Sequence, residues 1–446
     1  MTLLKSIMMG FVVFGLLNPC FTASAKNNVE YDMQVDSITI KNTHRVTKSE
    51  ILRLLPELNN KKINIKKLSK NIQIINDSGA ISIKVQFVPS KDGKYNVFVL
   101  AEDGKRENYN IGVNNTGDDY TGNWRTNLTY VNNDVSQNGD SLGVTYVTSP
   151  NHLQEVHQAM VNYKFLLPKI GDTISFGYSY SNSDMGQIAD IYGLGLYAVG
   201  KSSNYGLHYQ HNIKYTKKNK KVIDVGIDYK NFDGQHELRI GDYRWAAGGY
   251  DFSETVLSLG YTESIVMNNS FLTYNFGYSQ NLKGNKEAYN NYRTGSDDIF
   301  HVFKGSLNYQ HYLDNKWILV GNLEGQYSND DLLGTEQFSL GGVGSIRGLK
   351  SGAGSGDKGY KMSLEAYTPE VFHNGKFVVF TDFGHTFNNH NNIGEVSKTM
   401  TSYGLGYRFN DKRGLYISLD YAKVTKHSGV SDSYRLPWHL NIVKTF

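Results

Sequence analysis

The chain has 446 residues with 46 Lys and Arg against 42 Asp and Glu, and the resulting net charge of +4 is too small to indicate a nucleic-acid partner. Aromatic residues make up 13% of the chain, with 32 Tyr beside 45 Gly, yet the mean hydropathy is only −0.45. This composition argues against a helical soluble enzyme and is typical of a membrane β-barrel, in which only every second strand residue faces lipid.

Residues 1–25 have the pattern of a secretory signal peptide. Lys5 supplies the positive start, Ile7 to Leu17 form an apolar segment, and Ala23-Ser24-Ala25 offers a cleavage site. The only cysteine, Cys20, lies in this segment, so we expect a mature chain without disulfides or thiolate metal sites. The rest of the sequence has no apolar run near the roughly 18 residues that a helical membrane span needs.

A short linker, 26–35, precedes a small α+β domain that we predict over residues 36–103. Its elements follow the order strand, helix, helix, strand, strand. Thr47 can cap the first helix through its side-chain oxygen, and the second helix is expected from Ile65 to Ile75, where apolar residues recur every three or four positions.

The fourth element of this domain alternates apolar and polar residues, which predicts a strand. An exposed strand edge can accept an extended peptide through backbone hydrogen bonds, so this strand is a candidate substrate-binding edge. The sequence equally allows the barrel to cover it. The apolar positions are Ile81, Ile83, Val85 and Phe87.

Residues 105–446 read as a long series of segments with period two, such as Leu207 to Tyr215. One face of each segment can contact lipid and the other a polar lumen. We count sixteen segments of about 9 to 14 residues, as expected for an all-β transmembrane barrel, although periodicity alone does not exclude 14 or 18. They begin near Glu107, Asn123, Ser141, Val156, Asp172, Tyr205, Val222, Val256, Phe271, His301, Trp317, Lys361, Phe377, Met400, Leu415 and Trp438.

Short turns such as Asn410 to Gly414 alternate with long polar stretches such as Asn281 to Asp298, as expected of periplasmic turns and external loops. The chain ends on an alternating strand with a terminal aromatic, which is similar to the assembly signal of outer-membrane barrels. Its apolar face holds Trp438, Leu440, Ile442 and Phe446.

One segment places a single arginine, Arg347, among glycines and small residues from Gly341 to Leu349. Glycine permits positive φ and close backbone approach, so this loop can fold into a confined space and present one cation. A solvated surface loop explains the same residues about as well. A second glycine-rich stretch, Gly354 to Gly359, matches a dinucleotide fingerprint in spacing but lacks the helix and parallel strand that such a site needs.

Two motifs carry a family resemblance. Glu336 to Gly342, leading into Ser345-Ile346-Arg347-Gly348, is similar to loop 6 of the outer-membrane protein 85 superfamily, and Phe380 to His385 resembles its partner motif on the barrel wall. With a small domain and sixteen strands, the closer likeness is to the two-partner secretion transporters of the hemolysin-secretion and filamentous-adhesin type.

The resemblance implies a sixteen-strand barrel with one periplasmic POTRA domain and an inward loop 6 at about 330–358. Arg347 would pair with Asp382 inside the barrel, Gly348 would keep the backbone compact, and Gly384 would leave space for the loop. In a partly wet lumen, this pair would contribute modest stability. The implied site residues are Ile346, Arg347, Gly348 and Leu349 on the loop and Phe380, Asp382 and Gly384 on the wall.

Two departures from the family are evident. We expect a single periplasmic domain where the family usually has two, and about ten residues, Lys26 to Val35, precede it where the family often has a helix that plugs the pore. Either the chain is a reduced transporter or its substrate is recognised differently. Leu349 stands where an aromatic is common, so we expect looser packing at the loop tip.

The implied function is secretion of a large β-helical exoprotein, in extended form, across the outer membrane of a Gram-negative-type bacterium, without nucleotide hydrolysis. The alternatives are a barrel-assembly factor of the same superfamily and a passive porin. We expect no enzymatic activity, catalytic residue, metal or cofactor. The partners would be the exoprotein, outer-membrane lipid and the barrel assembly machinery, with the transporter a monomer.

Overall fold

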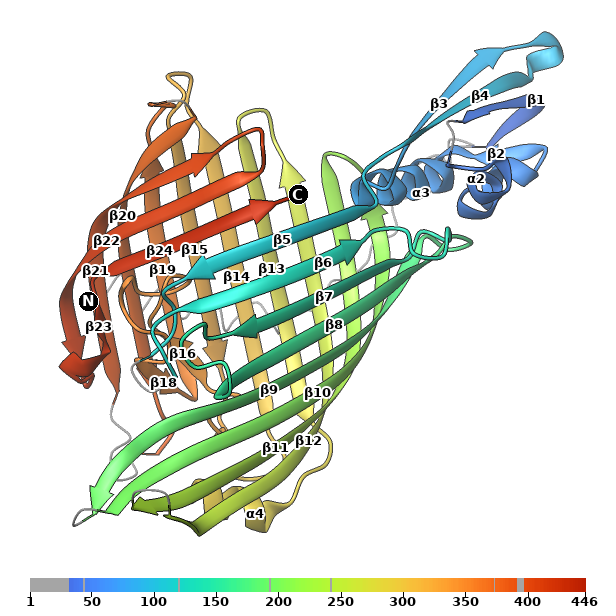
Figure 1. Ribbon diagram of the computed structural model, residues 1–446. Helices are drawn as coiled ribbons and strands as arrows, with labels where there is room; N and C mark the ends of the chain where they lie inside the picture. The colour runs from blue at the N-terminus through green and yellow to red at the C-terminus, as the bar shows by residue number, and fades with distance from the viewer. Residues whose placement is uncertain are drawn as a thin grey trace, which may run out of the picture.

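The computed structural model describes residues 32–42, 45–118, 121–191, 194–240, 243–372, 374–390 and 397–446. They form a closed barrel with a small domain beside one of its ends (Figure 1). The predicted signal peptide lies outside the described residues. None of the helices described has the length and apolar character needed to cross a membrane.

The small domain is a four-stranded sheet, ordered β2-β1-β4-β3, packed on two helices. The first strand begins at Asp32, inside the predicted 26–35 linker, so that boundary is wrong by four residues. The short strand β2, which pairs with β1, was not predicted. The elements are β1 (Asp32–Asn42), α2 (Lys48–Leu54), β2 (Lys62–Asn64), α3 (Ile65–Ser78), β3 (Ile81–Pro89) and β4 (Tyr95–Asp103).

Local signals define both helices. Thr47 accepts a hydrogen bond from the backbone N–H of Glu50, whose side chain returns one to the N–H of Thr47, which completes a capping box. Asn64 caps α3 and Gly79, at φ 75°, ends it. The helices and the sheet share one apolar core, which includes Ile51, Leu54, Leu55, Ile63, Leu68, Ile81, Ile83, Val97 and Val99.

In the part of the chain that the structure describes, sixteen antiparallel strands form a barrel that closes where β24 pairs with β5. The strands are β5 (Glu107–Asn114), β6 (Arg125–Asn132), β7 (Ser141–Thr148), β8 (Val156–Leu167), β9 (Asp172–Ile191), β10 (Leu194–Tyr215), β11 (Asn219–Ile240), β12 (Tyr243–Val266), β13 (Ser270–Asn281), β14 (His301–Tyr312), β15 (Ile318–Tyr327), β19 (Lys358–Tyr367), β20 (Gly375–Phe387), β21 (Lys398–Asn410), β22 (Leu415–Ser428) and β24 (Trp438–Thr445).

The predicted architecture is confirmed, but four strands are longer than predicted. Strands β9 to β12 have 20, 22, 22 and 24 residues instead of 9 to 14, and they extend beyond their neighbours at the end away from the small domain (Figure 1). Strand β10, for example, begins at Leu194 and not near Tyr205.

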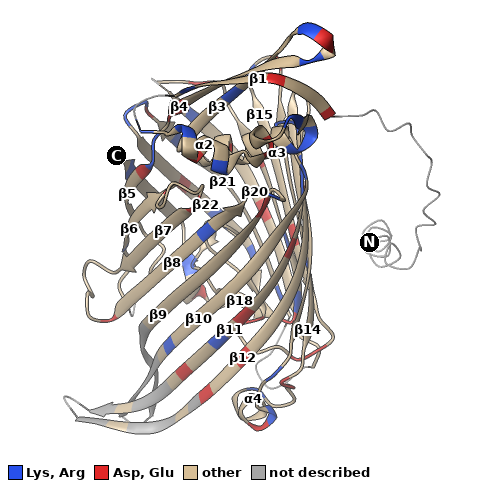
Figure 2. Ribbon diagram, turned by 90° about the vertical axis from the view of Figure 1, so that its right-hand side faces the viewer, with Lys and Arg blue, Asp and Glu red and all other residues tan. Residues whose placement is uncertain are grey.

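The outer surface of the barrel carries the apolar half of the alternation. On β5, Tyr109, Ile111 and Val113 are all exposed, as every second residue of a lipid-facing strand must be. Figure 2 shows that charged residues interrupt the strands only sparsely but gather in the small domain and near α4 (Lys286–Tyr292).

The two ends of the barrel differ. Turns such as 168–171 and 411–414 lie at the end that carries the small domain, and the long connections 282–300 and 328–357 lie at the other. The connection 282–300 contains α4, a helix that was not predicted from its polar sequence. Short turns and long connections are thus segregated to opposite ends, as predicted for periplasmic turns and external loops, and α4 lies at the end with the long connections.

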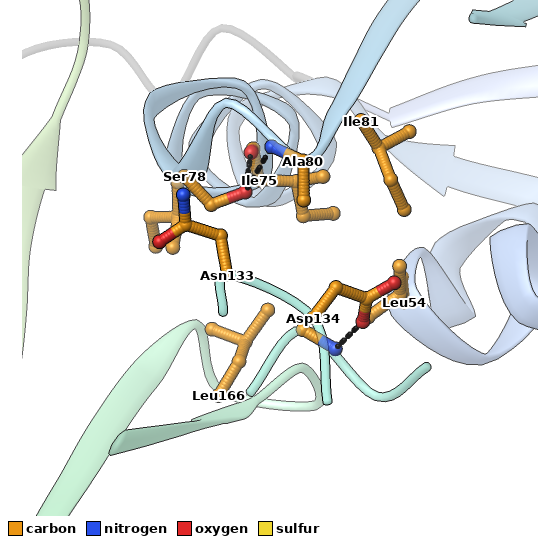
Figure 3. A pocket seen from close by; sticks show the side chains of 10 residues that line it. Leu54, Ile75, Ser78, Ala80, Ile81, Asn133, Asp134 and Leu166 are labelled. Atoms are coloured by element: carbon orange, nitrogen blue, oxygen red, sulfur yellow. Dashed lines mark hydrogen bonds between the residues drawn. The ribbon is translucent and has the colours of Figure 1, made fainter. Parts of the chain in front are cut away.

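The small domain contacts the short turns at its end of the barrel. Arg106, in the connection to β5, lies 2.8 Å from Asp134 of the β6–β7 turn and 3.5 Å from Glu50 of α2. Lys70 of α3 forms an ion pair of 3.2 Å with Asp172 at the start of β9. A cavity of about 20 Å³ remains between the two parts (Figure 3). Its lining includes Leu54, Ile75, Ser78, Ala80, Ile81, Asn133, Asp134 and Leu166.

Candidate functional site: loop 6 inside the barrel

Loop 6, which we define as residues 328–357 between β15 and β19, folds into the barrel (Figure 1). It carries three short strands. β16 (Phe338–Leu340) pairs with β18 (Gly354–Gly356) inside the loop itself, whereas β17 (Gly348–Leu349) pairs with β23 (Arg435–Leu436) in the connection between β22 and β24. The loop tip is therefore attached to a second connection as well as to the wall.

The tip presents Arg347 to Asp382 on the inner face of β20. The guanidinium Nε and Nη2 donate to the two carboxylate oxygens at 2.8 and 2.7 Å, and the backbone N–H of Arg347 donates at 3.0 Å. Arg347 is 3% exposed and Asp382 is 1% exposed. Two parallel side-chain bonds fix the orientation of the arginine as well as its position.

Further partners on the wall surround the same guanidinium. Nη1 donates to Glu365 at 2.6 Å and Nη2 donates to Ser363 at 3.0 Å, both from β19. The guanidinium carbon lies 3.5 Å from the ring centroid of Phe380, a cation–π contact. One arginine thus faces two carboxylates, and the expected partly wet lumen is wrong at this point because the charges are almost fully buried.

Sequence reasoning missed three members of the site: Ser363 and Glu365 on β19, and His439 on β24. The Nε2 of His439 accepts a hydrogen bond of 2.9 Å from the backbone N–H of Gly348, and its side chain is buried. The alternation of the last strand carried the signal, because His439 falls on the face opposite Trp438 and Leu440 and must therefore point into the lumen.

Two glycines allow the close approach of loop and wall. Gly348 has φ +92°, and a Cβ there would lie 2.8 Å from Val424 Cγ2. A Cβ at Gly384 would lie 2.8 Å from a methyl carbon of Leu340 and 3.0 Å from one of Ile346. A larger residue at either position would displace the tip from its partners on the wall.

The loop tip also has an apolar core of its own. Ile346 and Leu349 are fully buried in a cluster with Leu340, Ala353 and Met400 of β21. The expectation of looser packing at Leu349 is wrong, because this cluster and the β17–β23 pairing enclose its side chain.

The predicted acceptor edge, β3, lies at the border of its sheet. Its register with β4 turns the backbone groups of Ile83, Val85 and Phe87 outward, but Asn76 already bonds both the N–H and the C=O of Ile83, at 2.6 and 2.9 Å. The side chains of Ile81 and Ile83 are buried in the domain core, so a ligand could not contact them.

The predicted C-terminal residues lie on the outer face of β24. Trp438, Ile442 and Phe446 are exposed and Leu440 is partly so. Lys444 interrupts this face, and its ammonium group donates to the backbone carbonyl of Arg413 in the neighbouring turn. The outer face of the terminal strand is thus apolar except at Lys444, near the end that carries the small domain.

Comparison with protein families agrees with this architecture. The family described as haemolysin secretion/activation protein ShlB/FhaC/HecB matches residues 93–409. The heme/hemopexin transporter protein HuxB of Haemophilus influenzae strain 86-028NP is 24% identical over 393 residues, which cover 85% of this chain and 67% of the relative. The outer membrane transporter CdiB of Dickeya dadantii strain 3937 is 33% identical over 93 residues, or 20% of this chain and 17% of the relative.

Among solved structures, CdiB from Escherichia coli superposes with a TM-score of 0.76. The aligned part covers 93% of this chain and 77% of that structure at 16% sequence identity. At this identity the likeness concerns the fold, namely a small domain followed by a closed barrel.

Proposed function

Because the chain belongs to the haemolysin secretion/activation family ShlB/FhaC/HecB, an outer-membrane family, we propose that it exports a large partner polypeptide through its barrel in extended form. The proposal includes a POTRA role for residues 32–103, with this domain in the periplasm. It also includes transport without nucleotide hydrolysis, driven by folding of the partner outside the cell.

The main observation behind the proposal is that loop 6 obstructs the barrel and is held there by contacts that can be broken. Loop 6 occupies the lumen, and the polar contacts of Arg347 attach its tip to β19 and β20. Such contacts hold one conformation, yet water and polar groups of a passing polypeptide can replace them. We therefore assign Arg347 and Asp382 as a latch that keeps the channel closed at rest.

The small domain is the proposed receptor. The β3–β4 hairpin projects away from the barrel (Figure 1), and the register leaves the backbone groups of Val85 and Phe87 facing outward along the β3 edge. An extended segment of the partner could pair there without a set side-chain sequence. The Ile83 end is the less suitable part of this edge, because Asn76 uses its backbone groups.

The last strand supports insertion by the barrel assembly machinery. Its outward face holds Trp438, Ile442 and the terminal Phe446, all exposed where lipid would lie. We propose that the inserted transporter acts as a monomer, since the barrel closes on itself through β24 and β5.

The first test is the neighbouring gene, which we expect to encode a large β-rich exoprotein. Co-expression of that protein with the transporter should release it into the medium. Retention of the exoprotein in the periplasm by cells that insert the wild-type barrel would contradict the proposed function.

A disulfide tests whether the loop tip must move. Leu349 and Arg435 lie directly opposite each other in the β17–β23 pair, and the next pair, Lys350 with Tyr434, is hydrogen-bonded at 2.7 Å. Leu349 and Arg435 are therefore a non-hydrogen-bonded pair, whose Cα separation of about 4.5 Å suits a disulfide. The double Leu349→Cys, Arg435→Cys variant should block export when oxidised and regain it on reduction.

The two single-cysteine variants are the matched controls, since neither can form the bridge. Export at the wild-type rate by the oxidised double variant would show that the tip stays in place during transport. The latch assignment would then be wrong.

A further inference from the structure

A second buried arginine–aspartate pair lies at the external end of loop 6. Arg293 follows α4 in the connection between β13 and β14, and its Nη1 and Nη2 donate to the carboxylate oxygens of Asp357 at 2.6 and 3.0 Å. Arg293 is 8% exposed and Asp357 is fully buried. This pair thus resembles the Arg347–Asp382 pair at the tip in both its burial and its bidentate hydrogen bonds.

Asp357 joins three separate connections. Its carboxylate accepts the backbone N–H of Leu332 within loop 6 at 2.8 Å and that of Asn389, in the connection after β20, at 2.9 Å. Arg293 links the connection after β13 to this carboxylate, and its Nη1 also donates to the backbone carbonyl of Leu332 at 2.6 Å. These contacts draw the three external connections together around one carboxylate.

Helix α4 places Arg293. Asn285 caps it by accepting from the N–H groups of Glu287 and Ala288, and the helix ends one residue before the arginine. On its inner side, Tyr289 is fully buried against Phe252 of β12. The same cluster contains Val256, Phe300, Val302, Leu332 and Leu333, so α4 and the start of loop 6 share one apolar core.

The base of loop 6 has a further attachment to the wall. Lys230 of β11 forms an ion pair with Glu336, and its ammonium lies 3.9 Å from Glu254 of β12. The connections after β13, β15 and β20, which meet at Asp357, therefore lie beside β11 and β12. This is the end of the barrel opposite the small domain (Figure 1).

We propose that the Arg293–Asp357 pair is an external clamp that closes the outer mouth of the barrel and must open when the polypeptide leaves. The inference rests on the proposed export function. Asp357 and Arg293 both lie in connections between strands, so parting them lets α4 and loop 6 separate while the strand pairing of the barrel stays intact. The clamp acts through the position of these connections and need not touch the polypeptide.

The test is the conductance of the purified full-length protein in planar lipid bilayers, which needs no partner. Arg293→Gln and Asp357→Asn should each raise the fraction of time spent in open states by roughly tenfold or more, because loss of one partner strands the other in a buried site. The double variant should open no more often than the stronger single variant, since both changes break one contact. Arg293→Lys, which keeps the charge but loses the bidentate fit, should fall between Arg293→Gln and the wild type.

The matched control is Arg408→Gln. Arg408 forms a bidentate pair with Asp420, at 2.7 and 2.9 Å, in which the carboxylate is buried and the arginine partly so, but both residues lie on adjacent wall strands, β21 and β22. This variant should keep wild-type conductance. Heat-modifiable mobility in gels checks that every barrel is folded, and Arg293→Lys serves if Arg293→Gln fails that check.

Wild-type conductance in folded Arg293→Gln and Asp357→Asn barrels would overturn the clamp. Equal opening in Arg408→Gln would also overturn it, because the effect would then follow any lost ion pair. Failure of the wild-type protein to export its partner would count against the proposed function alone, since the conductance result stands without a partner.

Discussion

The tip and the base of loop 6 are held by the same chemistry in opposite arrangements. At the tip, the loop supplies the cation, Arg347, and rigid wall strands supply the carboxylates of Asp382 and Glu365. At the base, the loop supplies the carboxylate of Asp357, and the donors come from connections between strands, among them Arg293. A pair anchored in strands fixes a position, whereas a pair between connections fixes only their distance from each other.

This difference predicts separate consequences. Loss of the tip pair should free a loop that still closes the outer mouth, and loss of the base pair should open the mouth while the tip stays on the wall. The variants below can break or sharpen that distinction, beginning with the largest expected effect.

Arg347→Ala should have the greatest effect on export. It leaves Asp382 and Glu365 facing each other in a buried site without a cation, a situation that typically costs about 3–5 kcal/mol. We expect export to fall by roughly a hundredfold, because a tip without its wall partners no longer returns to one ordered position and obstructs the lumen instead of opening in a defined way. Barrel insertion should stay intact, and the two are measured by partner in the medium and by heat-modifiable mobility. Export near the wild-type level would show that the tip pair does not hold the loop for transport.

Asp382→Asn should be milder than Arg347→Ala. The arginine keeps Glu365 at 2.6 Å, so its charge is not left alone, and the amide can still accept one hydrogen bond. Glu365→Gln should be milder again, because Asp382 accepts three hydrogen bonds from Arg347 and Glu365 only one. The same export assay measures the three variants. A larger loss of export for Glu365→Gln than for Asp382→Asn would contradict the assignment of Asp382 as the main partner of Arg347.

Gly348→Ala should weaken the tip without changing any charge. At φ +92° an L-residue is strained by about 1–2 kcal/mol, and the added Cβ would meet Val424 and Ala422. Gly344→Ala, four residues earlier, is the matched control because a Cβ there meets nothing within 4 Å. We expect a several-fold loss of export for the first and none for the second, and equal losses would mean that loop flexibility, not close approach, is what matters.

The junction with the small domain should respond most weakly, and it does so through pH. Burial and the nearby Asp134 raise the pKa of Glu50 from 4.5 to about 7. The folded junction therefore binds this proton more tightly than a solvated glutamate does, so its stability is greatest below about pH 4.5 and declines as the pH rises through 7.

Protease protection of the junction should accordingly decline between pH 5 and pH 8, on the scale of the pKa shift. Glu50→Gln should remove this decline while keeping the helix cap, because glutamine also serves in a capping box. Glu287→Gln, an exposed change on α4, should behave as the wild type. A decline that persists in Glu50→Gln would assign the pH dependence to another group.

The sequence predicts most where lipid imposes a pattern. Period-two alternation, as in Leu207 to Tyr215, identified the barrel and its strand number because each membrane strand must hide a polar face and expose an apolar one. Beyond the membrane that requirement ends, and the polar run Lys201 to Asn204 within β10, just before the predicted start near Tyr205, gave no alternation to follow. The extension of β9 to β12 was missed for this reason.

The two ion pairs differ in the same way. Arg347 and Asp382 were predicted through motifs that resemble a known family. Arg293 and Asp357 lie 64 positions apart, the first after a short helix in a polar segment and the second in a glycine-rich stretch considered only as a nucleotide motif. Only the folding of α4 against Phe252 brings them together, and a helix of 7 residues leaves little periodicity in a sequence.

The small domain sits off the barrel axis. Its ion pairs reach Asp134 in the β6–β7 turn, Asp172 at the start of β9 and Lys220 at the start of β11. The tip of loop 6, in contrast, is held by β19, β20 and β24. These two groups of strands occupy different arcs of the barrel circumference. A polypeptide released by the small domain would therefore enter the barrel along the strands β6 to β11. The loop tip that obstructs its path is attached on the other side, to β19, β20 and β24, so the polypeptide would meet the unattached side of the loop first.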